Sequence, residues 1–292
     1  MESCIFASKI TTKQACNAYF GNENERMSID GWIRNREQRG HVTFAVSELQ
    51  EVFADRSSKG IKTELRRLTL RGRIVSVFRG FYVIIPVQYQ LKRIVPPSYY
   101  VDELMRYVGK PYYISLLSAA ALHGATHQRS MQYQIMTVAP RLKKGTVKYP
   151  LLNWCYRPII PESLLVIKNA EMGILRVSNP ELTAVDLIQF ADYVGGYQRA
   201  ATVLAELVEA IDIRRMEAVI PYTKASTIQR FGYILEFVLG ESEMADQLYA
   251  TLKKHFPKRH SYFMSTTQAP SEESLPNRWY INMNIEIEID DL

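Results

Sequence analysis

Cysteine is scarce in this 292-residue chain, and its three positions are far apart. Cys4, Cys16 and Cys155 are odd in number and lack the short spacings of zinc ligands. The sequence therefore predicts neither a disulfide framework nor a structural zinc site, and a reducing, cytoplasmic location is expected.

Long apolar runs and phosphate-binding loops are missing as well. No segment approaches the ~20 consecutive apolar residues that span a membrane, and residues 1–16 lack the apolar core of a signal peptide. No glycine-rich loop of the Walker or dinucleotide type occurs. We therefore expect no membrane partner and no cofactor.

Candidate catalytic groups are few. His123 and His127 have the four-residue spacing of helical metal ligands, but Gly124 interrupts the segment and no third ligand is evident. Cys155 has no base near it in sequence and is typical of a buried thiol. Asp186 is a lone carboxylate in an apolar helix, which favours a cap or a buried bond to neighbouring backbone. The prediction is a protein without a catalytic or metal site, not an enzyme.

The chain does carry a concentrated positive charge. Residues 56–79 contain one acid, Glu64, and eight basic residues: Arg56, Lys59, Lys62, Arg66, Arg67, Arg71, Arg73 and Arg79. The segment nets 8 − 1 = +7, whereas the whole chain nets +6, so the remainder nets −1. Such a basic patch is typical of a protein that binds nucleic acid.

The same stretch has the pattern of a helix followed by a tight hairpin. Ser57 or Ser58 can cap the helix, and Gly72 follows its last turn. Two strands are expected over residues 73–78 and 81–85, because only Arg79-Gly80 separates these β-branched and aromatic runs. Three apolar residues recur at helical spacing: Ile61, Leu65 and Leu68. Lys59, Lys62, Thr63 and Arg66 then face the other way, with Arg67 on a flank.

A basic helix followed by a hairpin is typical of the recognition helix and wing of a winged helix-turn-helix domain. A first helix is expected around Ile29, Trp32 and Ile33, ending at Gly40, and a short strand over residues 43–45. Ser47 is expected to cap a second helix over residues 48–53, whose Leu49, Val52 and Phe53 face the core. The domain would span residues 27–86. A winged helix that contacts proteins is the alternative interpretation.

The rest of the chain predicts an α+β protein with a second, mixed α/β domain over residues 99–292. Residues 1–26 form an N-terminal extension, and the proline-bearing residues 87–98 a surface linker. Helices are expected at 101–108, 112–123, after the cap Asn179, and at 197–209, 223–239 and 242–254. Strands are expected at 132–138, 147–156, 164–169 and 174–177. Residues 279–289 alternate apolar and polar side chains, which predicts a final strand whose solvated face carries Glu286, Glu288 and Asp290.

Four segments in succession carry a family resemblance: RGRIVSVFRGFYVIIP, YYISLLSAAALHGATHQ, ILRVSNPELTAVDLIQF and GGYQRAATVLAEL. Their order resembles the AbiEi antitoxin family of type IV toxin–antitoxin and phage-abortive systems. The resemblance covers about residues 27–207.

The resemblance implies an antitoxin whose winged helix represses its own operon by binding double-stranded DNA at inverted repeats. The second domain would counteract a partner toxin that resembles the AbiEii nucleotidyltransferases, with direct binding left open. By position, the DNA contacts would fall on five residues of the helix and two of the wing: Lys59, Lys62, Thr63, Arg66, Arg67, Arg73 and Arg79. The family implies no catalytic residues that can be placed here.

Two further interpretations compete with the autoregulating antitoxin. A ligand-responsive winged-helix transcription factor would be favoured by a pocket lined with polar groups in the second domain. A DNA-targeted nuclease would be favoured by metal-dependent cleavage of DNA.

Overall fold

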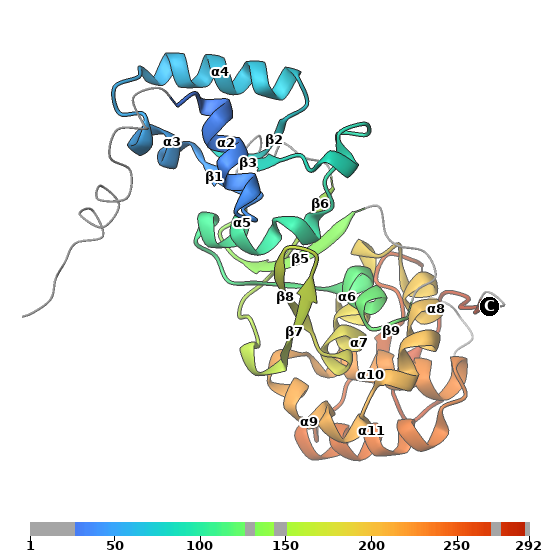
Figure 1. The fold of residues 1–292 in the computed structure, drawn as a ribbon. Coiled ribbons are helices and arrows are strands. Elements are labelled where there is room, and N and C mark those ends of the chain that lie inside the picture. Colours follow the sequence, from blue (N-terminus) through green and yellow to red (C-terminus); the bar gives the residue numbers. More distant parts are fainter. Residues whose placement is uncertain (1–26, 126–131, 143–150, 270–275, 290–292) are drawn as a thin grey trace, which may run out of the picture. The chain divides into compact units, whose positions relative to one another are not determined.

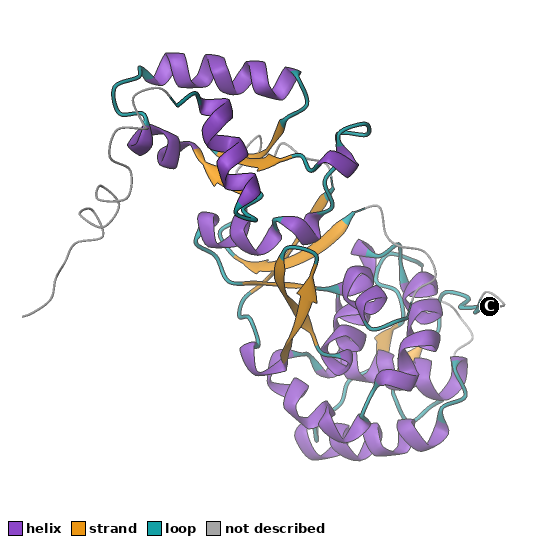
Figure 2. Ribbon diagram, in the orientation of Figure 1, coloured by secondary structure: helices purple, strands orange, loops and turns teal. Residues whose placement is uncertain are grey.

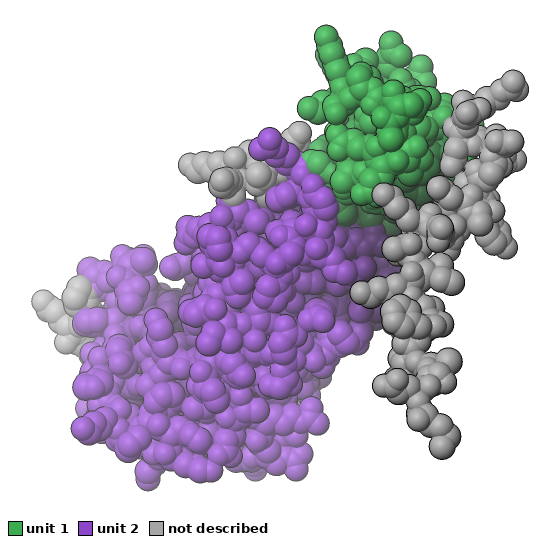
Figure 3. Space-filling view, turned by 90° about the vertical axis from the view of Figure 1, so that its left-hand side faces the viewer, with its two compact units in different colours: residues 1–76, 80–94 green, residues 77–79, 95–292 purple. Residues whose placement is uncertain are grey.

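The computed structural model describes residues 27–125, 132–142, 151–269 and 276–289. The chain divides into two compact units, one of residues 1–76 and 80–94 and the other of residues 77–79 and 95–292 (Figure 3). The fold is α+β, as expected. The expected extension over residues 1–26 lies outside the described residues.

The first unit has the element order of a winged helix-turn-helix. Its helices are α2 (Ile29–Gln38), α3 (Val46–Val52) and α4 (Ser58–Leu70), and its strands are β1 (Thr43–Ala45), β2 (Ile74–Phe78) and β3 (Phe81–Ile84) (Figure 1). The strands form one sheet in the order β1-β3-β2, in which β1 runs antiparallel to β3. The three helices and the hairpin expected from the sequence are all present.

Local signals set both ends of α4. The Ser57 hydroxyl accepts a hydrogen bond from the Gly60 N–H at 3.1 Å and so caps an otherwise unpaired donor. At the other end Gly72 has a φ of +69°, the left-handed conformation that ends many helices. Between them the expected stripe of Ile61, Leu65 and Leu68 is buried, each side chain 1% exposed.

The start of α3 differs from the expectation. The helix begins at Val46, and the Glu48 carboxylate accepts the N–H of Ala45 at 2.7 Å. Ser47 is therefore an exposed residue within the helix and not its cap, because the chain passes directly from β1 into α3. Val52 was expected in the core and is 41% exposed, whereas Leu49 and Phe53 are buried. The helix ends at Val52, and Phe53 has a non-helical backbone (φ −112°, ψ 53°), so the three side chains do not follow one helical face.

The segment between the winged helix and the first long helix of the second unit contains two short 3-10 turns, Val87–Tyr89 and Pro97–Tyr99. Val87 and Leu91 are exposed, which agrees with a surface position. Val95 is fully buried, so the segment is anchored at that residue.

The second unit contains a mixed five-stranded sheet (Figure 2). Its strands are β4 (Tyr112–Ile114), β5 (Tyr133–Val138), β6 (Leu152–Arg157), β7 (Leu165–Ala170) and β8 (Gly173–Ser178), in the order β6-β5-β4-β8-β7. The pairs β4–β5 and β7–β8 are antiparallel, and the pairs β5–β6 and β4–β8 are parallel. The sequence located the last four of these strands, although residues 147–150 of the expected 147–156 segment lie outside the described residues.

Residues 112–114 were expected in a helix and instead form β4, the central strand of the sheet. The helix, α6 (Leu116–Leu122), begins only after Ser115. Tyr112, Tyr113 and Ile114 are aromatic and β-branched residues that suit a strand, and all three are buried. A short apolar run shows neither the helical nor the strand periodicity, so its own sequence cannot distinguish the two. The alanines that follow favour a helix, and extending that helix back over residues 112–114 was wrong.

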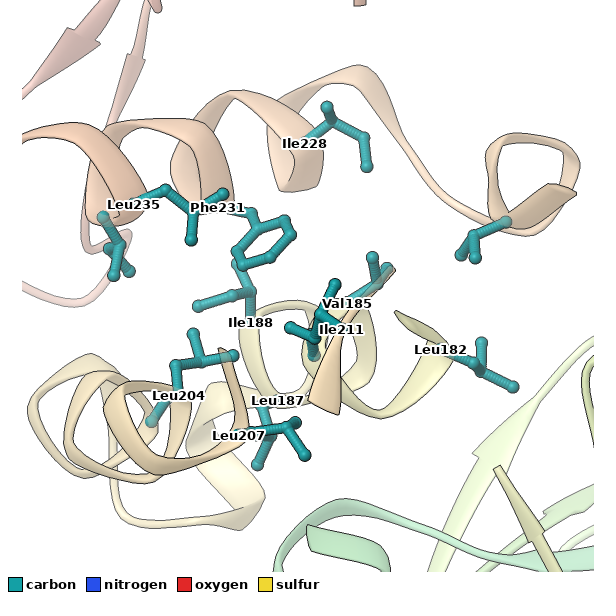
Figure 4. Close-up of a cluster of buried hydrophobic side chains, with 14 of the residues drawn as sticks. Leu182, Val185, Leu187, Ile188, Leu204, Leu207, Ile211, Ile228, Phe231 and Leu235 are labelled. Atoms are coloured by element: carbon teal, nitrogen blue, oxygen red, sulfur yellow. The ribbon is translucent and has the colours of Figure 1, made fainter. Parts of the chain in front are cut away.

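The second unit contains seven helices in its described part, and all but the first of them contribute side chains to one hydrophobic core. They are α5 (Val101–Val108), α6, α7 (Pro180–Gln189), α8 (Tyr197–Leu207), α9 (Met216–Val219), α10 (Ala225–Tyr233) and α11 (Ser242–His255). Short turns lie at Glu162–Leu164, Ala191–Tyr193, Val208–Ala210, Ile213–Arg215 and Ile220–Tyr222, and a π-turn at Ile234–Val238 continues α10. Every residue of α7 from Glu181 to Ile188 is buried, because α8 and α10 pack around it (Figure 4). The expected cap is present: Asn179 Oδ1 accepts the Leu182 N–H at 2.9 Å.

The expected final strand over residues 279–289 is mostly absent. Only β10 (Ile281–Asn282) pairs, in parallel, with β9 (Tyr262–Phe263). The alternation itself is correct: Trp279 and Ile281 are fully buried, and Glu286 and Glu288 are exposed, while Asp290 lies outside the described residues. One-sided burial against helices produces the same period of two as a sheet.

Candidate nucleic-acid interface and a second polar site

Helix α4 presents one continuous polar face. Lys59, Lys62, Thr63 and Arg66 follow one another at i, i+3, i+4 and i+7, so their side chains share one side of the helix, opposite the buried stripe. All four are exposed. Lys59, Lys62 and Arg66 form no ion pair with any other residue that the structure describes, so their charges are available to an anionic partner.

The remaining basic residues of the cluster are placed differently. Arg67 is exposed and lies 3.5 Å from Glu64 on the same helix. Arg73 is half-buried, its guanidinium 3.0 Å from Glu37 and 4.0 Å from Asp30 of α2, so its charge is largely balanced within the first unit. Arg79 is exposed at the hairpin turn.

Asp186 has side-chain partners and not the backbone partner that the sequence led us to expect. Its carboxylate accepts the Tyr113 hydroxyl at 2.6 Å and faces the Arg157 guanidinium at 3.2 Å, and Arg157 also donates to the Tyr113 oxygen at 2.6 Å. Burial raises the pKa of Asp186 to about 6, with Arg157 opposing the rise. All three side chains are buried, so the cluster links β4, β6 and α7 in the interior of the second unit.

The other candidate groups are inert in their surroundings. Burial raises the pKa of the Cys155 thiol to about 12, which keeps it protonated near neutral pH. His123 Nε2 lies 2.7 Å from the Ser178 carbonyl oxygen, and burial lowers the pKa of His123, so its ring is neutral. His127 lies outside the described residues. No group of three potential metal ligands occurs among the residues that are described.

A polar pocket of about 260 Å³ lies in the second unit and was not found from the sequence. Its lining includes Tyr197 of α8, Thr227 and Arg230 of α10, Lys224 just before α10, and Ser265 after β9. These residues come from three separate stretches of the chain, so no local sequence motif predicts the pocket.

The comparisons with known proteins match part of the second unit to a family model. Residues 113–237 match the model of the AbiEi antitoxin C-terminal domain. The match covers less than half of the chain. It supports an antitoxin role in a toxin–antitoxin system, implies a toxin as functional partner, and favours a regulator over an enzyme.

A solved structure shares the fold of nearly the whole chain. It is the RV2827C protein from Mycobacterium tuberculosis, with a TM-score of 0.63 and 16% sequence identity over 87% of this chain and 90% of that one. At this identity the likeness concerns the fold. No curated protein sequence matches the chain. In the described part of the chain, no helix has the length and apolar character needed to cross a membrane.

Proposed function

We propose that this protein is an antitoxin that counteracts a nucleotidyltransferase-like toxin, and that it is also a DNA-binding repressor of its own operon. The observation that carries the DNA-binding part is the exposed face of α4, where three cations without acidic partners lie on the helix that a winged helix-turn-helix inserts into the major groove. The match of residues 113–237 to the AbiEi antitoxin C-terminal domain supports the antitoxin part.

The residues of this face divide by expected role. We assign Arg66 and Thr63 to base contacts, so losing either should relax sequence preference by roughly 1–3 kcal/mol. Lys59, Lys62 and Arg67 suit phosphate contacts, as does Arg79 at the hairpin turn, and these should weaken binding to all sequences similarly. Arg73 should contribute less, because Glu37 and Asp30 already balance its charge.

Repression and toxin neutralisation should be separable within the full-length protein. The double variant Lys62→Gln, Arg66→Gln changes only exposed side chains of the first unit, so the second unit stays intact. We expect the double variant to lose repression of a reporter that is driven by the promoter of the antitoxin operon, where inverted repeats would be the operator. It should still protect cells that express the toxin from an unrelated promoter.

The matched control is Lys253→Gln, an exposed lysine on α11 of the second unit. It should keep both repression and protection. A double variant that still represses fully would exclude α4 as the DNA-binding element. A wild-type protein that represses but never protects would exclude the antitoxin role, whether or not the toxin is bound directly.

A ligand-responsive regulator is the second candidate function. The specific observation in its favour is the polar pocket at the start of α10. Both functions can coexist in one chain, since the pocket and the α4 face belong to different units.

A further inference from the structure

The pocket beside α10 contains a buried positive charge with no carboxylate partner. Arg230 is 8% exposed, and its Nε and one terminal nitrogen donate to the carbonyl oxygens of Phe263 and Met264 at 2.8–3.1 Å. No acidic side chain within the described residues forms an ion pair with it. Its guanidinium also lies over the rings of Tyr197 and Tyr262, at 5.9 and 5.8 Å from their centroids. Carbonyl groups and aromatic rings stabilise a guanidinium but do not neutralise its charge, so the pocket keeps a positive centre.

Thr227 gives a second, independent observation. The residue is 3% exposed and lines the pocket, yet its hydroxyl has no hydrogen-bond partner among the described residues. A hydroxyl on a residue that lines a cavity, without a protein partner of its own, is free to bind a ligand or water there.

The start of α10 adds positive potential at the same place. The helix has nine residues, and no side chain caps its first turn. Its unpaired N–H groups carry the positive end of the helix dipole, which favours anions. Lys224 stands exposed at the rim. The exposed Asp192 also lies at the rim. Two positive charges, on Arg230 and Lys224, and one negative charge, on Asp192, give the lining of the pocket a net charge of 2 − 1 = +1.

We propose that this pocket binds a phosphate group, either free or borne on a small metabolite. Hydroxyl donors, a helix N-terminus, a guanidinium and an ammonium together are the donor set that phosphate oxygens accept from. The volume of about 260 Å³ lies just below the ~300 Å³ at which pockets for drug-sized ligands begin, so the bound part is small. The inference does not depend on DNA binding, because every lining residue belongs to the second unit.

The test uses the full-length protein with three probes: inorganic phosphate, adenosine monophosphate and adenosine. Isothermal titration and thermal unfolding should detect the two phosphate-bearing probes and not adenosine. Tighter binding of the nucleotide than of inorganic phosphate would identify a phosphorylated metabolite as the source, and the reverse order would identify free phosphate.

Three substitutions locate the site. Thr227→Val should weaken phosphate binding about tenfold, the loss expected for one hydrogen bond to a charged group, while leaving the unliganded protein equally or more stable. Lys224→Gln should weaken it roughly three- to fivefold, as an exposed charge does. Asp192→Asn should tighten it, since a repulsive charge is removed. Lys258→Gln, an exposed lysine with no contact to the pocket, is the control and should change nothing.

Two outcomes overturn the inference. One is the absence of binding by either phosphate-bearing probe at millimolar concentration. The other is binding that Thr227→Val, Lys224→Gln and Asp192→Asn leave unchanged, which would show an adventitious anion elsewhere on the surface.

Discussion

Replacing Asp186 by alanine should destabilise the second unit more than any surface substitution. Asp186 is completely buried, and the side chain of its partner Arg157 is 3% exposed. The substitution would leave that guanidinium buried without an acid, which typically costs about 3–5 kcal/mol. The hydroxyl of Tyr113 would also lose its acceptor. Such a loss is a large part of the ~5–15 kcal/mol by which most domains are stable.

The assay is urea unfolding of the full-length protein, followed by tryptophan fluorescence. Trp154 and Trp279 belong to the second unit, so the substitution Trp32→Phe confines the signal to that unit. Glu162→Ala provides the matched control, because it breaks an ion pair of similar length at the surface. Glu162 lies 2.9 Å from Arg176, and the two side chains are 57% and 41% exposed, respectively. We expect the control to cost less than about 1 kcal/mol.

A second variant separates charge from packing. Replacing Asp186 by leucine and Arg157 by methionine together removes both charges and should restore most of the stability lost in Asp186→Ala. If Asp186→Ala costs no more than Glu162→Ala, the reasoning from burial is wrong. If the double replacement is no better than the single one, the loss comes from the cavity and not from the orphaned charge.

Three further predictions follow from single contacts. Ser57→Ala should cost the first unit about 1 kcal/mol, whereas Ser47→Ala should cost almost nothing. Thermal melts read by Trp32 fluorescence compare the two, and equal effects would contradict the capping assignment. Gly232→Ala would place a Cβ about 2.1 Å from the Trp279 ring, so we expect a loss of at least ~1–3 kcal/mol; an unchanged melting temperature would refute this packing. Because burial raises the pKa of Asp186 to about 6, the folded state keeps a proton that the unfolded state releases. The free energy of unfolding of the wild type, relative to that of Asp186→Asn, should therefore fall by up to about 3 kcal/mol between pH ~4 and ~6 and then level off. A rise across that pH range would contradict a raised pKa of Asp186 in the folded state.

The first unit was predictable because its determinants are local. Sixteen residues contain the cap at Ser57, the left-handed turn at Gly72 and the apolar stripe between them. Each of these signals determines the conformation of residues next to it in the sequence. The prediction failed at Ser47, where the helix start is set by the end of β1 and by a carboxylate three residues further along. A sequence window around a serine does not contain that information.

The second unit was less predictable because its determinants are distant. Tyr113 and Arg157, the partners of Asp186, lie 73 and 29 residues away in the sequence. The strand β4 exists because β5 and β8 flank it, and the last segment is extended because helices cover one side of it. The polar pocket joins α10 to a stretch some 35 residues later, as the 34-residue separation of Arg230 and Met264 illustrates.

The salt dependence of DNA binding tests the central claim most directly. The measurement is the affinity of the full-length protein for its own promoter duplex at several salt concentrations, by fluorescence anisotropy, for the wild type and the double variant Lys62→Gln, Arg66→Gln. If α4 binds the duplex, affinity should fall steeply with salt, and the double variant should bind more weakly with a slope reduced by about 0.9 for each lost phosphate contact. The assignment of the α4 face to DNA would be contradicted by a wild-type affinity that does not change with salt concentration. It would also be contradicted by a double variant whose affinity and salt dependence equal those of the wild type.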